Sequence, residues 1–418
     1  MNEQLIVKNF GPIKDATVDF KRVTVFIGPT GGGKSTLAKL AAILRKGQIN
    51  KEGFFDANLS FADVSMENYI QPDTNIDWTN SKGVGINIGN PETMNFDNLL
   101  QPQTHGYNIP NNEFNDFIIN KSEVDIEKVK ADISSKLQKG GIVDIDDSDL
   151  EKTIISVKNE LEKKVVDLFY KKNIFPLETY YIPSERIFVA AIRKSWAGFI
   201  NNDIGLPKTL SSFANIYFQA REIINILRIS FLGIDFFRDN EQDLIVTNEL
   251  FPLKISETAS GIQSTTPMLV VLEYLSRQKE ITHSFIVEEP ELNLYPTAQQ
   301  GLMNWLVEKC TKGENDLTIT THSPYILSHI NLLLYAYQVV ENHPDRADDV
   351  AKVVPRESWI NPKEFACYHV EGQKENGIYS IVNPETGLIS YNMLDAIAGA
   401  ESSEFEKLLD INAGLEVE

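Results

Sequence analysis

The sequence predicts an α/β protein with a largely parallel central sheet and crossover helices. In the second half of the chain, short apolar runs at 284–289 and 316–321 alternate with helical stretches at 260–277 and 296–310. Such alternation is typical of parallel strands joined by helices. Near the start, a strand-like run leads into the glycine-rich segment Gly28–Ser35, and a helical pattern follows at once. Both observations indicate the same fold class.

The N-terminal elements are read from the spacing of apolar side chains. Residues 4–27 alternate in the manner of two or three short strands, with a turn at Gly11 and Pro12. Residues 33–46 predict a helix, because apolar side chains recur every three or four positions and Gly47 follows as a stop signal.

The middle of the chain predicts less regular structure. Residues 48–120 are rich in Asn, Asp, Gly and Pro and indicate loops and short strands. Residues 122–138 and 148–172 predict two helices separated by Gly140 and Gly141, which would form a short helical hairpin. The pair is far too short for a long coiled-coil arm.

The remaining elements surround the alternating segment. A strand opens 179–192, a helix is predicted over 208–233, and 241–255 indicate a hairpin with turns near Asn240 and Asn248. After Leu334 the pattern predicts a shorter α+β tail that ends in a helix near 402–410.

These expectations divide the chain into four regions. They are an α/β core in two segments (1–50 and 173–335), a loop- and strand-rich lobe (51–121), the helical hairpin (122–172) and an acidic α+β extension (336–418). The fold class is therefore an α/β core with a mixed, mainly parallel sheet, an antiparallel β lobe and a short helical insertion.

The charge is negative and uneven. The 418 residues hold 39 Lys+Arg against 59 Asp+Glu, a formal net charge of −20. Residues 1–50 hold eight basic and three acidic side chains, whereas 341–418 hold six and sixteen. A general polyanion binder is usually basic overall, so nucleic acid is not the ligand that charge indicates. The acidic tail is a candidate docking surface for a basic partner protein.

The chain shows no signal for export or membrane insertion. The start, MNEQLIVKNFGP, lacks a basic segment followed by an apolar one, and no apolar run approaches the roughly 20 residues that a spanning helix needs. Cys310 and Cys367 have no metal-ligand spacing and suit two buried thiols in a reducing compartment. We therefore expect a cytoplasmic protein with no membrane partner.

The strongest motif is GPTGGGKS, from Gly28 to Ser35, which satisfies the G-x-x-x-x-G-K-[ST] pattern of a phosphate-binding P-loop. The glycines allow a tight turn, and the helix that follows directs free amides and a positive dipole end at phosphate. Lys34 would reach the β- and γ-phosphates, and the Ser35 hydroxyl can bind Mg²⁺. The motif predicts a P-loop NTPase.

A pair of carboxylates follows an apolar run in SFIVEEPELNLYP, residues 284–296. Beside a P-loop, one carboxylate is needed near the metal and another to orient or deprotonate the attacking water. We assign Glu288 to the metal and Glu289 to the water. Taken alone, the pair is better explained as a strand that ends in a solvated acidic turn.

Two further motifs are weaker. SETASGIQS, residues 256–264, places Ser260 and Gly261 at a helix start, where a hydroxyl and free amides can bind phosphate, although an ordinary N-cap is the better explanation of that motif alone. LTITTHSPYIL, residues 317–327, delivers His322 at the end of a strand, where open α/β sheets present functional groups, although a structural histidine would also fit.

The order of the four motifs resembles that of ABC-type ATPases, and the chain most closely resembles their SMC/RecF/OLD-like branch. Within it, the chain is similar to stand-alone bacterial AAA-type ATPases related to OLD proteins, including ATPase subunits of anti-phage defence systems. The segments that carry the resemblance are LIVKNFGPIKDATVDF, YIPSER, EEPELNLYP, THSPYIL and YHVEGQKENGIYSIVNPETGLI.

The resemblance implies ATP and Mg²⁺ as cofactors and a homodimer in which two heads enclose two nucleotides, with a larger assembly left open. It implies Glu289 and His322 as the catalytic pair, with Ser35 and Glu288 at the metal. The implied nucleotide-binding residues are Gly28, Thr30, Gly31, Gly33, Lys34, Ser35 and Thr36, and, from the opposite head, Ser260, Gly261 and Gln263.

Some positions depart from the family pattern. Glu288 stands where aspartate is commoner, and the glutamine that usually joins the metal site has only weak candidates, Gln71 and Gln101. Arg186 matches a recurring family arginine, for which a salt-bridged structural role is the simplest explanation. About 80 residues follow the His322 segment without the repeated βα pattern of a Toprim nuclease, so we expect no nuclease activity in this chain.

Four functions compete. The first is a conformational switch or sensor that controls a separately encoded nuclease or toxin, in anti-phage defence. The second is a DNA-engaging repair or maintenance ATPase, for which Arg186, Arg193 and Lys194 would form a basic stripe. The third is a transporter subunit, which the long separation of Ser35 from Ser260 disfavours. The fourth is a non-hydrolysing scaffold, which Glu289 and His322 disfavour.

Overall fold

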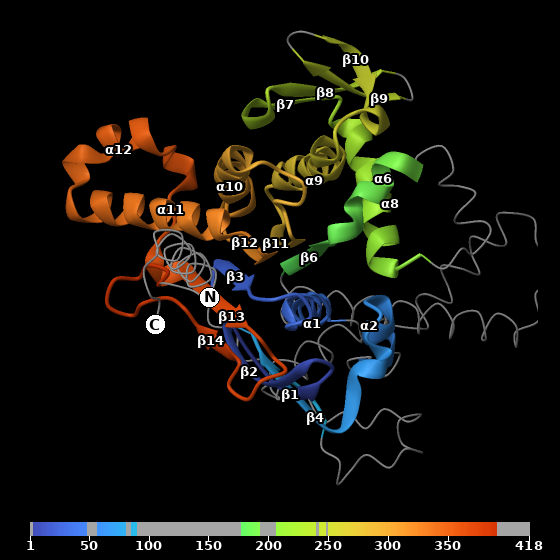
Figure 1. Ribbon diagram of the computed structural model, residues 1–418, viewed down its shortest axis with the longest axis vertical. Coiled ribbons are helices and arrows are strands. Elements are labelled where there is room, and N and C mark those ends of the chain that lie inside the picture. Colours follow the sequence, from blue (N-terminus) through green and yellow to red (C-terminus); the bar gives the residue numbers. More distant parts are fainter. Residues whose placement is uncertain are drawn as a thin grey trace, which may run out of the picture.

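The computed structural model describes residues 3–47, 57–80, 85–89, 177–192, 206–239, 242–247 and 250–390. Its centre is a six-stranded sheet with the order β14-β13-β3-β12-β11-β6 (Figure 1). Neighbouring strands from β13 to β6 run parallel, and β14 is antiparallel to β13. The strands are β3 (Val23–Ile27), β6 (Leu177–Ile182), β11 (Thr282–Glu288), β12 (Asp316–Thr321), β13 (Phe365–Val370) and β14 (Ile378–Ser380).

Two antiparallel sheets flank this centre. One has the order β2-β1-β4-β5, and the other has the order β10-β9-β8-β7. The strands of the first are β1 (Glu3–Phe10), β2 (Ile13–Phe20), β4 (Ile70–Thr79) and β5 (Gly85–Ile88). Those of the second are β7 (Ile226–Ile229), β8 (Ile234–Asp239), β9 (Gln242–Thr247) and β10 (Leu250–Lys254).

Helices cover both faces of the central sheet (Figure 1). On one side, α1 (Lys34–Lys46) packs with the β1 sheet, and α2 (Ala57–Asp63) lies nearby. The other side carries α6 (Ile187–Ile192), α8 (Lys208–Ile223), α9 (Ser260–Ser276), α10 (Pro296–Cys310), α11 (Pro324–Asn342) and, at the far end of α11, α12 (Ala347–Val353).

The core consists of two apolar clusters, one on each face of the sheet. Val25 and Ile27 of β3 belong to the cluster beneath α8 to α11, whereas Phe26 between them belongs to the cluster with α1 and the β1 sheet. This alternation follows from the two-residue side-chain period of a strand. Because both faces are buried, β3, β12 and β13 are buried along their whole lengths.

The predicted α/β class is confirmed, with a mainly parallel sheet and antiparallel sheets beside it. The helix predicted over 208–233 is too long, because α8 ends at Ile223 and 226–229 pair with β8. The β9–β10 hairpin forms as expected. The helices predicted over 122–138, 148–172 and 402–410 lie outside the described residues.

One strand from the predicted C-terminal extension belongs to the central sheet. Strand β13 lies beside β3, with His369 level with Ile27. The pattern in the tail indicated a separate α+β extension, but the fully buried run Phe365–Val370 completes the core next to the phosphate loop.

None of the helices in the described ranges is both long and apolar enough to cross a membrane.

Candidate active site

The glycine-rich segment forms the loop between β3 and α1. Gly28 has φ +151°, and a Cβ atom there would lie 2.3 Å from the carbonyl oxygen of Val370 at the end of β13. Real Cβ atoms do not approach backbone so closely, so this position requires glycine. A backbone hydrogen bond also fixes the loop, because the Gly372 N–H, in the segment after β13, donates to the carbonyl of Gly32 at 2.8 Å.

The start of α1 presents the predicted phosphate-binding groups. Gly33 precedes the helix with φ +103°. The first amides of a helix have no partner within the helix, so those of α1 are free to meet an anion at this loop. The predicted nucleotide-binding residues of the loop and helix differ in exposure. Gly28 is partly exposed, Thr30, Gly31 and Ser35 are exposed, and Gly33, Lys34 and Thr36 are buried.

Lys34 links the loop to the carboxylates of β11. Its ammonium donates to the carbonyls of Gly28 at 2.8 Å and Pro29 at 2.9 Å. Burial lowers the pKa of Lys34 to about 8, and the negative charges of Glu289 and Glu288 oppose that shift. The two motifs therefore share one electrostatic environment, at the carboxyl edge of the sheet.

Glu288 and Glu289 have different surroundings. Glu288 ends β11 and is 4% exposed, and its Oε1 has no hydrogen-bond partner of normal geometry among the described residues. Its charge lies near the Tyr181 hydroxyl, because burial and then this carboxylate raise the pKa of Tyr181. Glu289 is half-buried and has φ +40°, a left-handed conformation that costs a residue other than glycine on the order of 1–2 kcal/mol. Its N–H donates to the carbonyl of Thr320 at 2.9 Å. The turn thus aims Glu289 away from the strand.

The structure brings together His322 and Glu289, the two residues that the resemblance implies as the catalytic pair. The Nε2 atom of His322 lies 3.5 Å from Oε1 of Glu289. The hydrogen bond with His322 is the main cause that lowers the pKa of Glu289, so this carboxylate stays ionised at neutral pH. An ionised carboxylate beside a histidine can accept a proton from water.

Glu291 is a buried carboxylate that the sequence argument did not use. Its Oε1 accepts from the Thr321 hydroxyl at 2.6 Å and from the His322 N–H at 3.0 Å. Burial raises the pKa of Glu291. The sequence could have indicated this residue, because Glu291 is the third glutamate of the EEPE motif. Its contacts hold the backbone of His322 relative to the turn after β11.

Arg186 is fully buried, which excludes it from the basic stripe considered for DNA binding; Arg193 and Lys194 lie outside the described residues. The predicted salt bridge is absent from the described part of the chain, where the Arg186 guanidinium bonds only to backbone carbonyls. The sequence marks Arg186 only through the YIPSER resemblance, because burial and carbonyl contacts depend on tertiary packing.

The predicted signature residues open α9. Ser260 is exposed at the first turn, while a Cβ on Gly261 would lie 2.6 Å from the carbonyl of Asn293 in the turn after β11. The Gln263 side chain turns back and donates to the carbonyl of Thr258 at 2.7 Å. In this arrangement Gln263 secures the turn before the helix, rather than presenting its amide to solvent.

Of the two glutamines considered for the metal site, the structure describes only Gln71. Gln71 is exposed on β4 of the first antiparallel sheet, and Gln101 lies outside the described residues. The strands on the two sides of β11 are β12, where Thr320 is level with Glu288, and β6, which ends at Ile182 beside Val287, so neither side places a glutamine level with Glu288.

The residues at this edge fit Mg²⁺. A buried carboxylate oxygen without a partner, as at Glu288, is costly unless an ion or ligand meets it. Within the described ranges no group of three or more His, Cys, Asp or Glu could hold a metal by itself. Mg²⁺ suits such a site, because it commonly uses one or two protein oxygens together with water and substrate phosphates.

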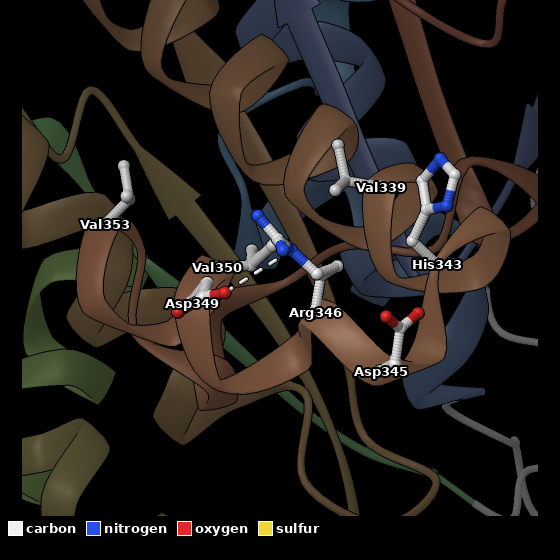
Figure 2. Close-up of a pocket in the computed structure, with 7 residues that line it drawn as sticks. All are labelled: Val339, His343, Asp345, Arg346, Asp349, Val350 and Val353. Carbon is white, nitrogen blue, oxygen red and sulfur yellow. Dashed lines mark ion pairs between the residues drawn. The ribbon is translucent and has the colours of Figure 1, made fainter.

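A separate cavity of about 640 Å³ lies at the other end of α11 (Figure 2). Its mixed lining consists of Val339, His343, Asp345, Arg346, Asp349, Val350 and Val353, and two of these residues, Arg346 and Asp349, form an ion pair at 3.3 Å. Val339 is the lining residue of α11 nearest the start of that helix at Pro324, so roughly 22 Å of helix separates this cavity from the end near His322. It is not part of the phosphate-binding site.

The fold and the site together define a P-loop ATPase of the ABC type. The chain belongs to the family described as "AAA ATPase domain", whose model matches residues 1–327. This match confirms the resemblance to ATP-binding heads, and with it the family's general use of ATP and Mg²⁺.

The chain is also similar to a curated protein of the OLD type. It is 23% identical over 362 residues to a protein named "OLD nuclease" from Thermus scotoductus. The match covers 83% of this chain and 63% of that protein, so the chain spans less than two thirds of the relative's length. The predicted resemblance to OLD-like ATPases is confirmed.

Solved structures with matching chains include SMC heads. The SMC head domain from Thermotoga maritima is 12% identical, with 79% of this chain and 92% of that chain covered and a TM-score of 0.34. A Smc head from Pyrococcus furiosus, bound to the C-terminal domain of ScpA, is 13% identical, with 96% and 98% covered and a TM-score of 0.34. Likeness at this level supports no inference about function.

Proposed function

We propose that this chain binds and hydrolyses ATP with Mg²⁺, and that two copies close around two nucleotides as a switch that controls a separately encoded effector, a nuclease or a toxin. The observation that carries the proposal is the convergence of Lys34, Glu289 and His322 at one edge of the sheet, with Glu289 and His322 3.5 Å apart. Three segments distant in sequence supply these groups.

The residues have complementary tasks. The amides of the loop and the Lys34 ammonium bind the phosphates, while the Ser35 hydroxyl and the Glu288 carboxylate hold the ion. When bound, Mg²⁺ neutralises charge on the phosphates. Glu289, ionised and half-buried, orients the attacking water and takes its proton. His322 orients Glu289 and lies where the γ-phosphate would be sensed.

Exposed aromatic side chains beside the site support a head-to-head contact. Tyr295 follows the turn after β11 and is 76% exposed, and Tyr325 lies three residues after His322 and is 54% exposed. Large exposed aromatics next to a functional edge are typical of a surface that a partner covers. Ser260, also exposed, would face the nucleotide of the second head.

The effector and the role in defence rest on the resemblance. The excess of acidic residues in 341–418 supports a basic protein partner. Within its described part, 341–390, nine acidic side chains stand against five basic ones, and several of these pair locally, as Lys374 does with Glu371. The remaining excess is what a basic partner would meet. A cytoplasmic location and the lack of intrinsic nuclease activity remain predictions.

Glu289→Gln tests the hydrolytic assignment. Glutamine keeps the shape but cannot accept the proton, so we expect turnover to fall by at least about 100-fold while ATP binding persists. ATP should then accumulate dimers, measured by size-exclusion chromatography with light scattering. His283→Gln is the control, because it changes a residue of the same strand at the end away from Glu288, and it should leave turnover per folded protein unchanged. Full turnover in Glu289→Gln would overturn the proposal.

A further inference from the structure

Arg186 joins three segments through backbone oxygens. Its Nε donates to Ser264 at 3.2 Å, Nη1 donates to Pro183 at 3.1 Å and Glu288 at 2.6 Å, and Nη2 donates to Glu289 at 2.7 Å. Buried cations are usually paired with a carboxylate. Here the guanidinium donates to four backbone carbonyls within the described part of the chain, and no carboxylate there accepts from it directly. Burial lowers the pKa of Arg186 to about 10, against the charges of Glu291, Glu288 and Glu289 nearby.

The bonded carbonyls belong to elements with separate tasks. Ser264 lies in the second turn of α9, the helix that begins at Ser260, whereas Glu288 and Glu289 carry the metal-binding and water-activating carboxylates of the proposed function. A guanidinium is planar and rigid, so its donors keep a fixed relation to one another. A shift of α9 at Ser264 therefore moves the donors that hold Glu288 and Glu289.

The backbone of Glu289 depends on this arginine. Its left-handed conformation, φ +40°, is held by the bond from its N–H to Thr320 and by the bond from Arg186 to its carbonyl. Strained conformations persist where surrounding contacts over-determine them. The direction of the Glu289 side chain toward His322 follows from that backbone.

A second contact connects the same two elements. The start of α9 packs closely against the turn after β11. The contact is so close that a Cβ atom on Gly261 would clash with the carbonyl of Asn293. The turn after β11 thus opposes movement of the start of α9. Arg186 transmits such movement to the backbone of Glu288 and Glu289.

We propose that Arg186 is a positioning residue that couples the start of α9 to the backbone of Glu289 in the same head. Contact of Ser260 and Gly261 with the nucleotide held by the second head would then set Glu289 for hydrolysis of the nucleotide held by its own head. The two ATP sites become cooperative through one side chain. The inference rests on the proposed two-head function.

Mixed dimers isolate this coupling. Head B carries Glu289→Gln, so only the site formed by the P-loop and Glu289 of head A turns over. Head A carries Ser260→Arg, Arg186→Lys, both or neither, and dimers are isolated through two affinity tags. Ser260 of head A faces the nucleotide of head B, so its replacement leaves the residues that form the active site of head A unchanged, and the Arg186→Lys dimers separate an effect through Arg186 from an effect on closure. The measurement is the turnover of each dimer.

The expected result is non-additive. Arg186→Lys keeps the charge but cannot span four carbonyls, so kcat should fall about 10- to 100-fold with the KM for ATP changed less than about threefold. With Arg186 present, Ser260→Arg should lower turnover at least about fivefold. In a head that already carries Arg186→Lys, the same change should lower turnover less than about twofold. Additive effects, or an unchanged kcat in Arg186→Lys, would overturn the coupling.

Controls separate coupling from folding. Arg221→Lys alters another largely buried arginine, which pairs with Asp243 beneath the second antiparallel sheet, and should leave turnover per folded dimer unchanged. Arg186→Gln, which buries no charge and keeps two N–H donors, repeats the cycle if the lysine variant has a low Tm. Reference dimers without turnover would overturn the proposed function and the coupling together, whereas turnover with additive effects would overturn the coupling alone.

Discussion

Gly28 has almost no room for a side chain in the phosphate loop, whereas Gly31 in the same loop has open space around it. A Cβ on Gly28 would lie 2.3 Å from the Val370 carbonyl, whereas one on Gly31 would have nothing within 4 Å, although both glycines have positive φ. A side chain at Gly28 would therefore meet both a clash and backbone strain, whereas a side chain at Gly31 would meet backbone strain alone.

Gly28→Ala should displace the loop from β13 and weaken ATP binding by at least about tenfold, because strain of roughly 1–3 kcal/mol adds to the clash. Gly31→Ala carries strain without the clash and should weaken binding less. Gly313→Ala, a left-handed glycine with open space around it and distant in sequence from the loop, controls for strain alone. Titration of ATP by calorimetry gives the comparison, and equal effects at Gly28 and Gly31 would contradict it.

At the scale of elements, α1 is fixed at both ends. The phosphate loop holds its start, and near its last turn the buried Arg45 donates to Glu3 of β1 at 2.8 Å, Asp316 of β12 at 2.9 Å and Ser284 of β11 at 2.7 Å. Burial raises the pKa of Asp316 to about 6, against the opposing charge of Arg45. This cluster joins the central sheet to the first antiparallel sheet.

Arg45→Met should lower the free energy of unfolding by roughly 3–5 kcal/mol, because it leaves two buried carboxylates without their cation. Lys352→Met removes an exposed partner of Asp349 and should cost less than about 1 kcal/mol. Denaturant unfolding followed by circular dichroism measures both. Similar losses in the two variants would show that the Arg45 cluster is not an anchor.

Which elements could be predicted depends on how local their signals are. The P-loop, β11 and β12 have short, periodic and strongly apolar patterns, so their order and the convergence of Lys34, Glu289 and His322 followed from the sequence. The end of α8 was missed because the apolar run around Ile223 suits a helix or a strand equally. The place of β13 beside β3, like the contacts of Arg186, is set by long-range packing that no local pattern encodes.

For the whole molecule, the proposed sandwich assigns each ATP to two heads. The P-loop, Glu289 and His322 come from one head, and Ser260 and Gly261 come from the other. Lys34→Ala and Ser260→Arg therefore damage different partners of one composite site. Each variant alone should lose ATPase activity, the first through phosphate binding and the second through sterics and charge at closure.

Mixing these two inactive variants should restore activity. A mixed dimer holds one intact site, formed by the P-loop of the Ser260→Arg head and the α9 helix of the Lys34→Ala head. Random pairing makes half of the dimers mixed, each with one of two sites, which by itself would give about a quarter of the wild-type rate. Because the intact site uses Glu289 of the head that carries Ser260→Arg, the coupling through Arg186 should lower this recovery at least about fivefold further, to about a twentieth of the wild-type rate. A mixture of Lys34→Ala with Glu289→Gln has no intact site and should stay inactive, because both changes fall on the same side of the composite site. Steady-state phosphate release against mixing ratio measures both pairs. Recovery in neither mixture, with dimers present, would mean that each head hydrolyses ATP with its own residues alone.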